Sequence, residues 1–402
     1  MSAFATPVSL RPAPVHPAYM TTEADDVELA RRWREDRKRW SERETVSDFE
    51  QAFGSWNGSR HVAAFDSGRM ALRAALEALE LEPGAEVIVP GYTCVVVPNA
   101  VRAARLTPVF ADIELDSYGL DPAAVERVLS SATRAIVVQH LYGLVSLHFE
   151  SLLALARRND LRVIEDCAQA MGAIWRGDRV GTVGDIGIYS TERSKVISTG
   201  EGGLAVTEDA RLGARLARAA EDAAAPSEDR VRRILDVVPL LHRQGHARGP
   251  LRGSPLARAR RAARIYPTTT VEEEQGDGPE FPPSRMSAPA AALGMNQLRK
   301  IESFNTRRRA AAERWDDWCV LTGHRRPVVA PGSTPIFLRY PVLVDPERKR
   351  WRDWAVRELG VELGVWFTGK LHPRDPDIPD LPHADTAVAR CVNLPTLLPD
   401  PG

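Results

Sequence analysis

From residue 61 onward, short runs of β-branched and apolar residues alternate with amphipathic stretches, a run recurring about every 25 residues. The runs at 87–89, 108–111, 135–138 and 162–164 are almost wholly apolar, which is typical of strands buried on both faces. Between them, Leu72, Leu76 and Leu79 mark one helix face. Alternation of this kind predicts an α/β fold, in which helices cover both faces of a parallel or mixed sheet.

The same pattern predicts how the rest of the chain is organised. Charged helices are expected over 26–60, two further strands at 186–189 and 204–206, and a helical stretch over 288–318. A strand at 336–344 and a helix at 351–358 then form a short α/β unit. Since a domain holds roughly 100 to 200 residues, the 402 residues predict an N-terminal arm and helix (1–45), a large domain (46–300) and a small C-terminal domain (301–402).

Composition excludes several classes of protein. Lys plus Arg is 53 and Asp plus Glu is 54, so the net charge of -1 argues against a dedicated nucleic-acid binder. No apolar run approaches the ~18 residues of a membrane span, and prolines interrupt the first 20 residues, which predicts a flexible arm instead of a signal peptide. The scattered cysteines predict a cytoplasmic protein without a metal site or disulfide framework: Cys94, Cys167, Cys319 and Cys391.

The pattern breaks down between about 214 and 282. A basic run there contains Arg248, Arg252, Arg258, Arg260, Arg261 and Arg264. An acidic run follows it, with Glu272, Glu273, Glu274, Asp277 and Glu280. Two interpretations stay open, a lid or surface for an anionic partner and a solvated, partly mobile insertion, because blocks of like charge are usually solvated.

Three clusters carry residues suited to chemistry. Asp66-Ser67-Gly68-Arg69 opens a helix, where backbone N–H groups suit a phosphate, although many strand-to-helix turns look alike. Glu165 and Asp166 come where a buried strand ends, the usual edge for ligands in open α/β sheets, and Asp166 also suits a helix cap. Lys195 lies among hydroxyls before the glycines at 200, 202 and 203, a setting that suits a Schiff-base lysine.

The three clusters together match what a pyridoxal phosphate site requires. The phosphate needs N–H donors and hydroxyls, the pyridine nitrogen needs an acid that holds its proton, and the aldehyde needs a lysine. Each cluster alone has an ordinary structural explanation, and their combination favours a pyridoxal phosphate enzyme.

The motifs also resemble those of the DegT/DnrJ/EryC1/StrS aminotransferases, the sugar aminotransferases of fold type I. The resemblance rests on 66–68, 165–169, Lys195 and 200–203, and extends to 90–93, 110–113, 139–143, 290–294 and 297–298. It covers about 45 to 395 and is weakest across 214–282. It implies a large αβα domain with a mixed sheet, a small C-terminal α/β domain and a homodimer with shared active sites.

The resemblance implies a role for each matched residue. Lys195 would bind pyridoxal 5'-phosphate covalently and move a proton between substrate carbon and cofactor. Asp166 would pair with the pyridine nitrogen, and Gln169 would reach the ring hydroxyl. Ser190 would bind the phosphate beside the backbone of Gly68 and Arg69. His372 resembles a late histidine that approaches substrate, and an ordinary surface histidine is the alternative.

Four positions depart from the family's pattern. Arg69 replaces a threonine and offers a cationic fork instead of a hydroxyl. Cys94 falls where an aromatic ring usually stacks on the cofactor, so either Tyr92 or another ring substitutes or the stacking is weaker. Pro283 falls near an asparagine that the family sends across the dimer, and the chain ends soon after Pro401, where a C-terminal helix would continue.

The resemblance implies an aminotransferase that moves an amino group from glutamate to a keto sugar or related cyclic ketone, in specialised-metabolite or cell-surface sugar biosynthesis. Another pyridoxal phosphate reaction, such as elimination, dehydration or carbon–carbon bond formation, is the first alternative. Lys195 argues against the dehydrating version, which typically carries histidine at that position. A non-enzymatic regulator is the second alternative, and the intact lysine, acid and glutamine argue against it.

Overall fold

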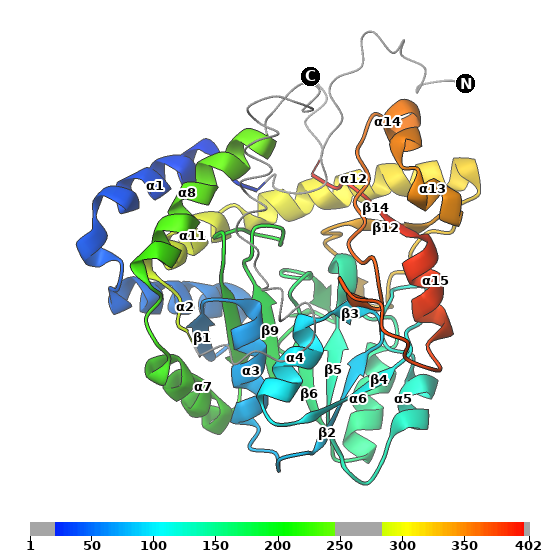
Figure 1. Cartoon of the computed structure of the whole chain (residues 1–402), viewed down its shortest axis with the longest axis horizontal. Coiled ribbons are helices and arrows are strands. Elements are labelled where there is room, and N and C mark those ends of the chain that lie inside the picture. Colours follow the sequence, from blue (N-terminus) through cyan, green and yellow to red (C-terminus); the bar gives the residue numbers. More distant parts are fainter. Residues whose placement is uncertain (1–20, 246–283, 398–402) are drawn as a thin grey trace.

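The computed structural model describes residues 21–245 and 284–397, and a seven-stranded mixed sheet lies at its centre (Figure 1). Its strands are β1 (His61–Phe65), β2 (Glu86–Pro90), β4 (Thr107–Ala111), β5 (Thr133–Gln139), β6 (Arg162–Asp166), β9 (Ile186–Ser190) and β10 (Gly203–Thr207). They are ordered β1-β10-β9-β6-β5-β2-β4. β10 pairs antiparallel with β1 and β9, and the other neighbours are parallel. The predicted mixed sheet is confirmed.

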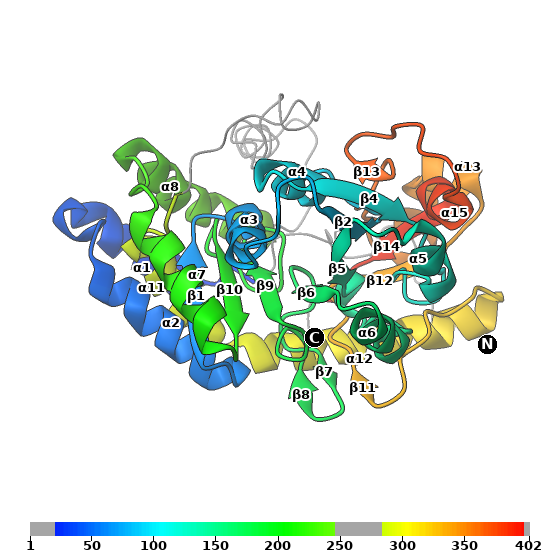
Figure 2. The same ribbon diagram turned by 90° about the horizontal axis from the view of Figure 1, so that it is seen from below.

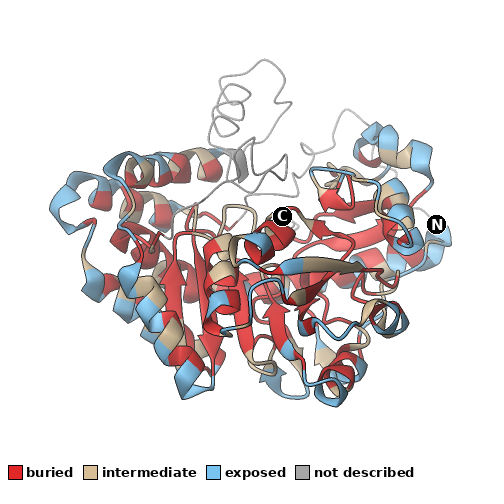
Figure 3. Cartoon of the chain, turned by 60° about the horizontal axis from the view of Figure 1, so that its bottom comes forward, coloured by how far each residue is buried: buried red, intermediate tan, exposed pale blue. Residues whose placement is uncertain are grey.

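Helices cover both faces of this sheet, because its strands are apolar on both sides. On β6, Val163 packs into one core and Ile164 into the other. The first core is closed by α2 (Arg43–Asn57), α5 (Pro122–Val128), α6 (Phe149–Arg158) and α11 (Ala288–Leu298). The second is closed by α3 (Gly68–Ala78), α4 (Val96–Ala103) and α7 (Ala210–Asp222). Figure 3 shows the buried strands between helices whose outer sides are exposed.

Two helices pack beside this layered body, α1 (Ala24–Glu35) and α8 (Glu228–Gly245). They share a small apolar core with α11, built on residues such as Trp33, Leu235 and Leu293. The predicted loss of regular structure from residue 214 is therefore wrong up to residue 245, because α8 presents an apolar face to α1. The charged runs at 248–280, Pro283, the N-terminal arm up to residue 20 and Pro401 lie outside the described residues.

The C-terminal part packs around an antiparallel pair, β12 (Tyr340–Leu343) and β14 (Cys391–Leu394). Its helices are α12 (Ile301–Thr322), α13 (Pro346–Arg350), α14 (Asp353–Leu359) and α15 (Pro382–Arg390). The strand predicted at 336–344 is shorter, because the backbone turns at Phe337 (φ 49°) and Ile336 N–H donates to Gly143. The helix predicted at 351–358 begins only at Asp353, and the helical stretch 288–318 is split at 299–300.

Short strands connect the C-terminal part to the large sheet. β13 (Leu371–His372) pairs in parallel with β3 (Thr93–Cys94), which brings residues near 370 beside the loop that follows β2. A separate small sheet is formed by β7 (Ile174–Trp175), β8 (Asp178–Arg179) and β11 (Ser333–Thr334), and it lies at the lower edge of Figure 2.

Within residues 21–245 and 284–397, no helix combines the length and the apolar character needed to cross a membrane.

Candidate active site

A cavity of about 390 Å³ opens where β5, β6 and β9 end and α3 begins. The carboxyl ends of parallel strands are the usual place for a ligand in an open α/β sheet. One wall comes from the C-terminal part, which contributes residues 365–367, 372 and 373. Seven of the predicted cofactor residues and the predicted substrate residue line the cavity: Gly68, Arg69, Cys94, Asp166, Gln169, Ser190, Lys195 and His372.

The turn after β1 is shaped by close backbone packing. Ser67 caps α3 by accepting a hydrogen bond from the Met70 N–H (3.3 Å). Gly68 lies against Ser190, so that a Cβ added at position 68 would lie 2.9 Å from the Ser190 Cβ. Gly203 lies equally close, since a Cβ there would lie 2.4 Å from the Gly68 nitrogen. The N-terminus of α3 and the Ser190 hydroxyl therefore meet at one end of the cavity, an arrangement suited to a phosphate.

An ion-pair cluster holds this turn from behind. Arg230, on α8, contacts the Asp66 carboxylate and also bonds Glu201 Oε2 through Nε (2.7 Å). Burial raises the pKa of the Asp66 carboxyl, and the positive charge of Arg230 opposes that rise. Asp66 Oδ1 also accepts from the Ser67 hydroxyl (2.9 Å). Helix α8, which the sequence pattern did not predict, therefore holds the turn at the start of α3 through Arg230.

Asp166 lies at the end of β6 with only 3% of its surface exposed. Its Oδ1 accepts from the Ala168 N–H (3.0 Å) and its Oδ2 from Gln139 Nε2 (3.2 Å). Burial raises the pKa of this carboxyl, while the Ala168 hydrogen bond and the charge of Lys195 act in the opposite direction. Gln169 is oriented by its side-chain oxygen, which accepts from the Tyr142 N–H (3.0 Å).

Lys195 lies in the loop between β9 and β10. Its backbone N–H donates to the Glu192 carbonyl (2.9 Å), and the Glu192 carboxylate accepts from the Ser194 N–H (2.9 Å). The hydroxyls of Thr191 and Thr199 bond each other (2.7 Å) across the loop. The hydroxyls that the sequence places around the lysine therefore brace its loop, and the amine nitrogen lies 4.9 Å from the centre of the Trp366 ring.

The structure places Tyr92 away from the cavity. Tyr92 is buried, its hydroxyl bonds the Tyr142 hydroxyl (2.9 Å), and its ring meets Phe367 edge to face. The expectation that Tyr92 supplies the missing ring is therefore wrong on geometry, because it does not line the cavity. Cys94 does line it, and burial raises the pKa of its thiol. The aromatic rings that line the cavity are those of Trp366 and Phe367.

Sequence reasoning missed three further residues of this site: Gln139, Trp366 and Phe367. Gln139 stands in a motif that was recognised without a role being assigned to it. The two aromatic residues stand six and five positions before His372, and the β13–β3 pairing together with a hydrogen bond from the Trp366 N–H to Asn393 Oδ1 (2.9 Å) brings that segment to the cavity. His372 itself accepts a hydrogen bond at Nδ1 from the Thr368 N–H (3.2 Å).

Comparison with known proteins agrees with this geometry. The model of the DegT/DnrJ/EryC1/StrS aminotransferase family matches residues 22–233 and 281–398. The L-glutamine:2-deoxy-scyllo-inosose aminotransferase of Streptomyces paromomycinus is 45% identical over 168 residues, which are 42% of this chain and 39% of that protein. The chain thus spans well under half of that relative's length.

Two other similar proteins match over most of their length. The GDP-perosamine synthase of Caulobacter vibrioides is 29% identical over 87% of this chain and 84% of its own. The solved structure of DesV from S. venezuelae superposes with a TM-score of 0.73 at 26% identity, covering 95% of this chain and 93% of that one.

Proposed function

The chain belongs to the DegT/DnrJ/EryC1/StrS aminotransferase family, and from this premise we propose that it uses pyridoxal 5'-phosphate to transfer an amino group to a keto sugar or a related cyclic ketone. The observation that carries the proposal is the meeting of Lys195, Asp166 and the α3 turn in one cavity. The names of the relatives, which specify an inosose acceptor in one case and a perosamine product in the other, support a ring-shaped acceptor.

The residues present fit such a cofactor. The α3 N-terminus and the Ser190 hydroxyl suit a phosphate dianion, and the buried Asp166 carboxylate suits a protonated ring nitrogen. The carbonyl oxygen of the Gln139 side chain is buried without a partner among the described residues, which indicates that a donor group belongs there. Gly68, Arg69, Gln169 and Cys94 complete the proposed binding residues.

Bound pyridoxal phosphate supplies a reactive carbonyl and an electron-accepting ring. Lys195 Nζ would be the group that holds the cofactor's carbonyl carbon and that moves a proton at the substrate carbon. Asp166, which is acceptor-only when ionised, keeps the proton on the ring nitrogen. Trp366 and Phe367 would supply an apolar wall beside Lys195, and His372 would approach the substrate.

The proposal also covers the amino donor and the oligomeric state of the protein. The sequence predicts glutamate as the amino donor, whereas the inosose relatives are named for L-glutamine, so both amino acids require testing. We also propose a homodimer located in the cytoplasm, and a division of the chain near residues 45 and 300.

The test compares the amounts of 2-oxo acid and of aminated acceptor that the reaction forms. Protein loaded with pyridoxal phosphate is incubated with L-glutamine or L-glutamate and with scyllo-inosose, 2-deoxy-scyllo-inosose or a nucleotide-linked keto sugar. Amino transfer predicts one molecule of 2-oxo acid for each molecule of aminated acceptor. An elimination product, or aminated acceptor without 2-oxo acid, would contradict the proposal.

A further inference from the structure

The motif Gln139-His140-Leu141-Tyr142-Gly143 begins at the last residue of β5 and holds both residues expected at the cofactor ring. The side chain of Gln139 donates to Asp166 Oδ2 (3.2 Å), and the backbone N–H of His140 donates to the Asp166 carbonyl (3.0 Å). The backbone N–H of Tyr142 donates to the Gln169 side chain (3.0 Å). One short segment therefore sets the position of Asp166 and Gln169.

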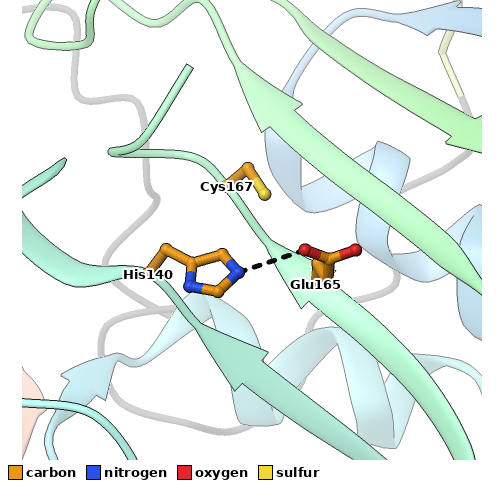
Figure 4. A group of neighbouring side chains, drawn as sticks. All are labelled: His140, Glu165 and Cys167. Atoms are coloured by element: carbon orange, nitrogen blue, oxygen red, sulfur yellow. Dashed lines mark hydrogen bonds and ion pairs between the residues drawn. The ribbon is translucent and has the colours of Figure 1, made fainter. Parts of the chain in front are cut away.

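His140 anchors this segment on the side of the sheet away from the cavity. Its Nδ1 accepts from the Ser146 N–H (3.1 Å), so the ring proton is on Nε2, which donates to Glu165 Oε2 (3.1 Å). Figure 4 shows this pair with Cys167 beside it. All three side chains are fully buried.

These three side chains lie within 4.8 Å of one another, as metal ligands do. The Glu165 carboxylate, however, already accepts from the backbone N–H groups of Gly181 (2.7 Å), Val183 (2.8 Å) and Gly184 (2.6 Å). Its oxygens and the histidine ring are therefore engaged within the protein. The group is a structural anchor for the 139–143 segment.

Gln139 is the member of the segment whose hydrogen bonding is incomplete. It lies opposite Asp166 in the β5–β6 register, is 6% exposed and lines the cavity. An ionised carboxylate only accepts, so the amide nitrogen must face Asp166. The amide oxygen then has no hydrogen-bond partner among the described residues. A buried acceptor in this state destabilises a protein unless a bound group donates to it.

We propose that Gln139 is a further binding residue for the cofactor ring. Its Nε2 holds the Asp166 carboxylate in place, and its Oε1 accepts part of the hydrogen bond from the protonated ring nitrogen. That nitrogen carries the N–H that Asp166 is expected to receive, and an N–H shared between two acceptors is common. The inference rests on the proposed function, because it concerns the same cofactor.

The test compares stability and affinity in the variant Gln139→Leu. In the cofactor-free protein the thermal midpoint is expected to change little, because removal of the unsatisfied buried acceptor offsets loss of the hydrogen bond from Gln139 Nε2 to Asp166 (3.2 Å). The dissociation constant of pyridoxal phosphate, measured by absorbance titration of the cofactor-free protein, is expected to rise ~10-fold or more, since hydrogen bonds to charged groups are lost. The unbranched variant Gln139→Met is expected to behave in the same way.

Asn57→Leu is the matched control. Asn57 is also a buried amide, but it is bonded to Ser59 Oγ (2.8 Å) and to the Tyr189 hydroxyl (3.1 Å), and it does not line the cavity. Its replacement is expected to lower the thermal midpoint and to leave the dissociation constant unchanged.

Two results would overturn the inference. One is a Gln139→Leu protein with a lowered cofactor-free midpoint and unchanged affinity. The other is failure of both Gln139 variants to fold, which would show a structural role. The proposed function fails separately, if the wild-type protein does not bind pyridoxal phosphate.

Discussion

The amine nitrogen of Lys195 lies 4.9 Å from the centre of the Trp366 indole ring, although 171 positions separate the two residues in the sequence (366 less 195). The guanidinium carbon of Arg339 lies 5.0 Å from the same ring. The C-terminal part therefore supplies an aromatic ring beside the Lys195 amine. Cys94, which stands where the resemblance predicts a ring, lines the same cavity as Trp366.

Trp366→Ala is expected to lower kcat/KM for the ring-shaped acceptor about tenfold, because aromatic and cation–π contacts contribute roughly 0.5–2 kcal/mol each. Trp366→Phe keeps an aromatic face and is expected to retain most activity. Trp351→Ala, at a ring that is 65% exposed, is the control and should leave the kinetics unchanged. Equal activity of the alanine and wild-type proteins would remove Trp366 from the site.

Gly68→Ala tests the close approach of the α3 turn to Ser190. The added methyl would lie 2.9 Å from the Ser190 Cβ, so we expect a loss of about 1–3 kcal/mol in the free energy of unfolding. Adding Ser190→Gly removes the atoms in conflict and should restore the stability without restoring cofactor affinity. Denaturant unfolding measures the stability of both proteins, and cofactor titration measures their affinity. A Gly68→Ala protein with the wild-type free energy of unfolding would refute the packing argument.

Arg230→Met tests the ion-pair cluster behind the same turn. It leaves the buried Asp66 carboxylate without its cation, and we expect a loss of about 1–3 kcal/mol in the free energy of unfolding. Asp66→Asn added to it should recover part of that loss. Arg232→Met is the control, because the Arg232–Asp229 pair is exposed and such pairs contribute about 0–1 kcal/mol. Equal losses in the two single variants would contradict the account.

Glu50, on α2, gives the stability a dependence on pH. Burial raises the pKa of its carboxyl from 4.5 to about 7, so the folded protein holds this proton more tightly than the unfolded chain. The stabilising contribution is therefore complete below about pH 4.5 and is lost as the pH rises through 7.

Glu50→Gln removes the group that loses its proton. It is expected to be more stable than wild type at pH 8, by at most on the order of 3 kcal/mol, and similar to it at pH 5. Glu44→Gln, at an exposed position of the same helix, should show no such difference. If the difference in free energy of unfolding between Glu50→Gln and wild type were the same at every pH, the raised pKa assigned to Glu50 would be contradicted.

The part of the site that sequence reasoning found is the part encoded locally. Lys195, Asp166 and Gly68 each stand in a short motif at the end of a strand, and a parallel sheet gathers such ends at one edge. Arg230 could not be found in this way, because it reaches Asp66 across 164 positions and stands in a helix whose periodicity was overlooked.

Tyr92, in contrast, was assigned to the site although the structure places it outside the cavity. An aromatic residue two positions from Cys94 was expected to replace the missing ring, because residues i and i+2 of an extended segment point to the same side. The packing of Tyr92 itself decides the outcome instead. Tyr92 turns into the apolar cluster with Tyr142 and Phe367. Trp366 comes to the cavity through long-range contacts that no local sequence pattern predicts, the pairing of β13 with β3 and a hydrogen bond from the Trp366 N–H to Asn393 Oδ1 (2.9 Å).

The central claim is tested most directly by the absorbance of the purified protein loaded with pyridoxal phosphate, recorded before and after addition of L-glutamine or L-glutamate. With wild-type protein, the band of the bound aldehyde form should be replaced by that of the amine form in the presence of at least one donor. Lys195→Ala should bind the cofactor without completing this change. A wild-type spectrum unaltered by every amino donor, or an unimpaired change in the Lys195→Ala protein, would contradict the account.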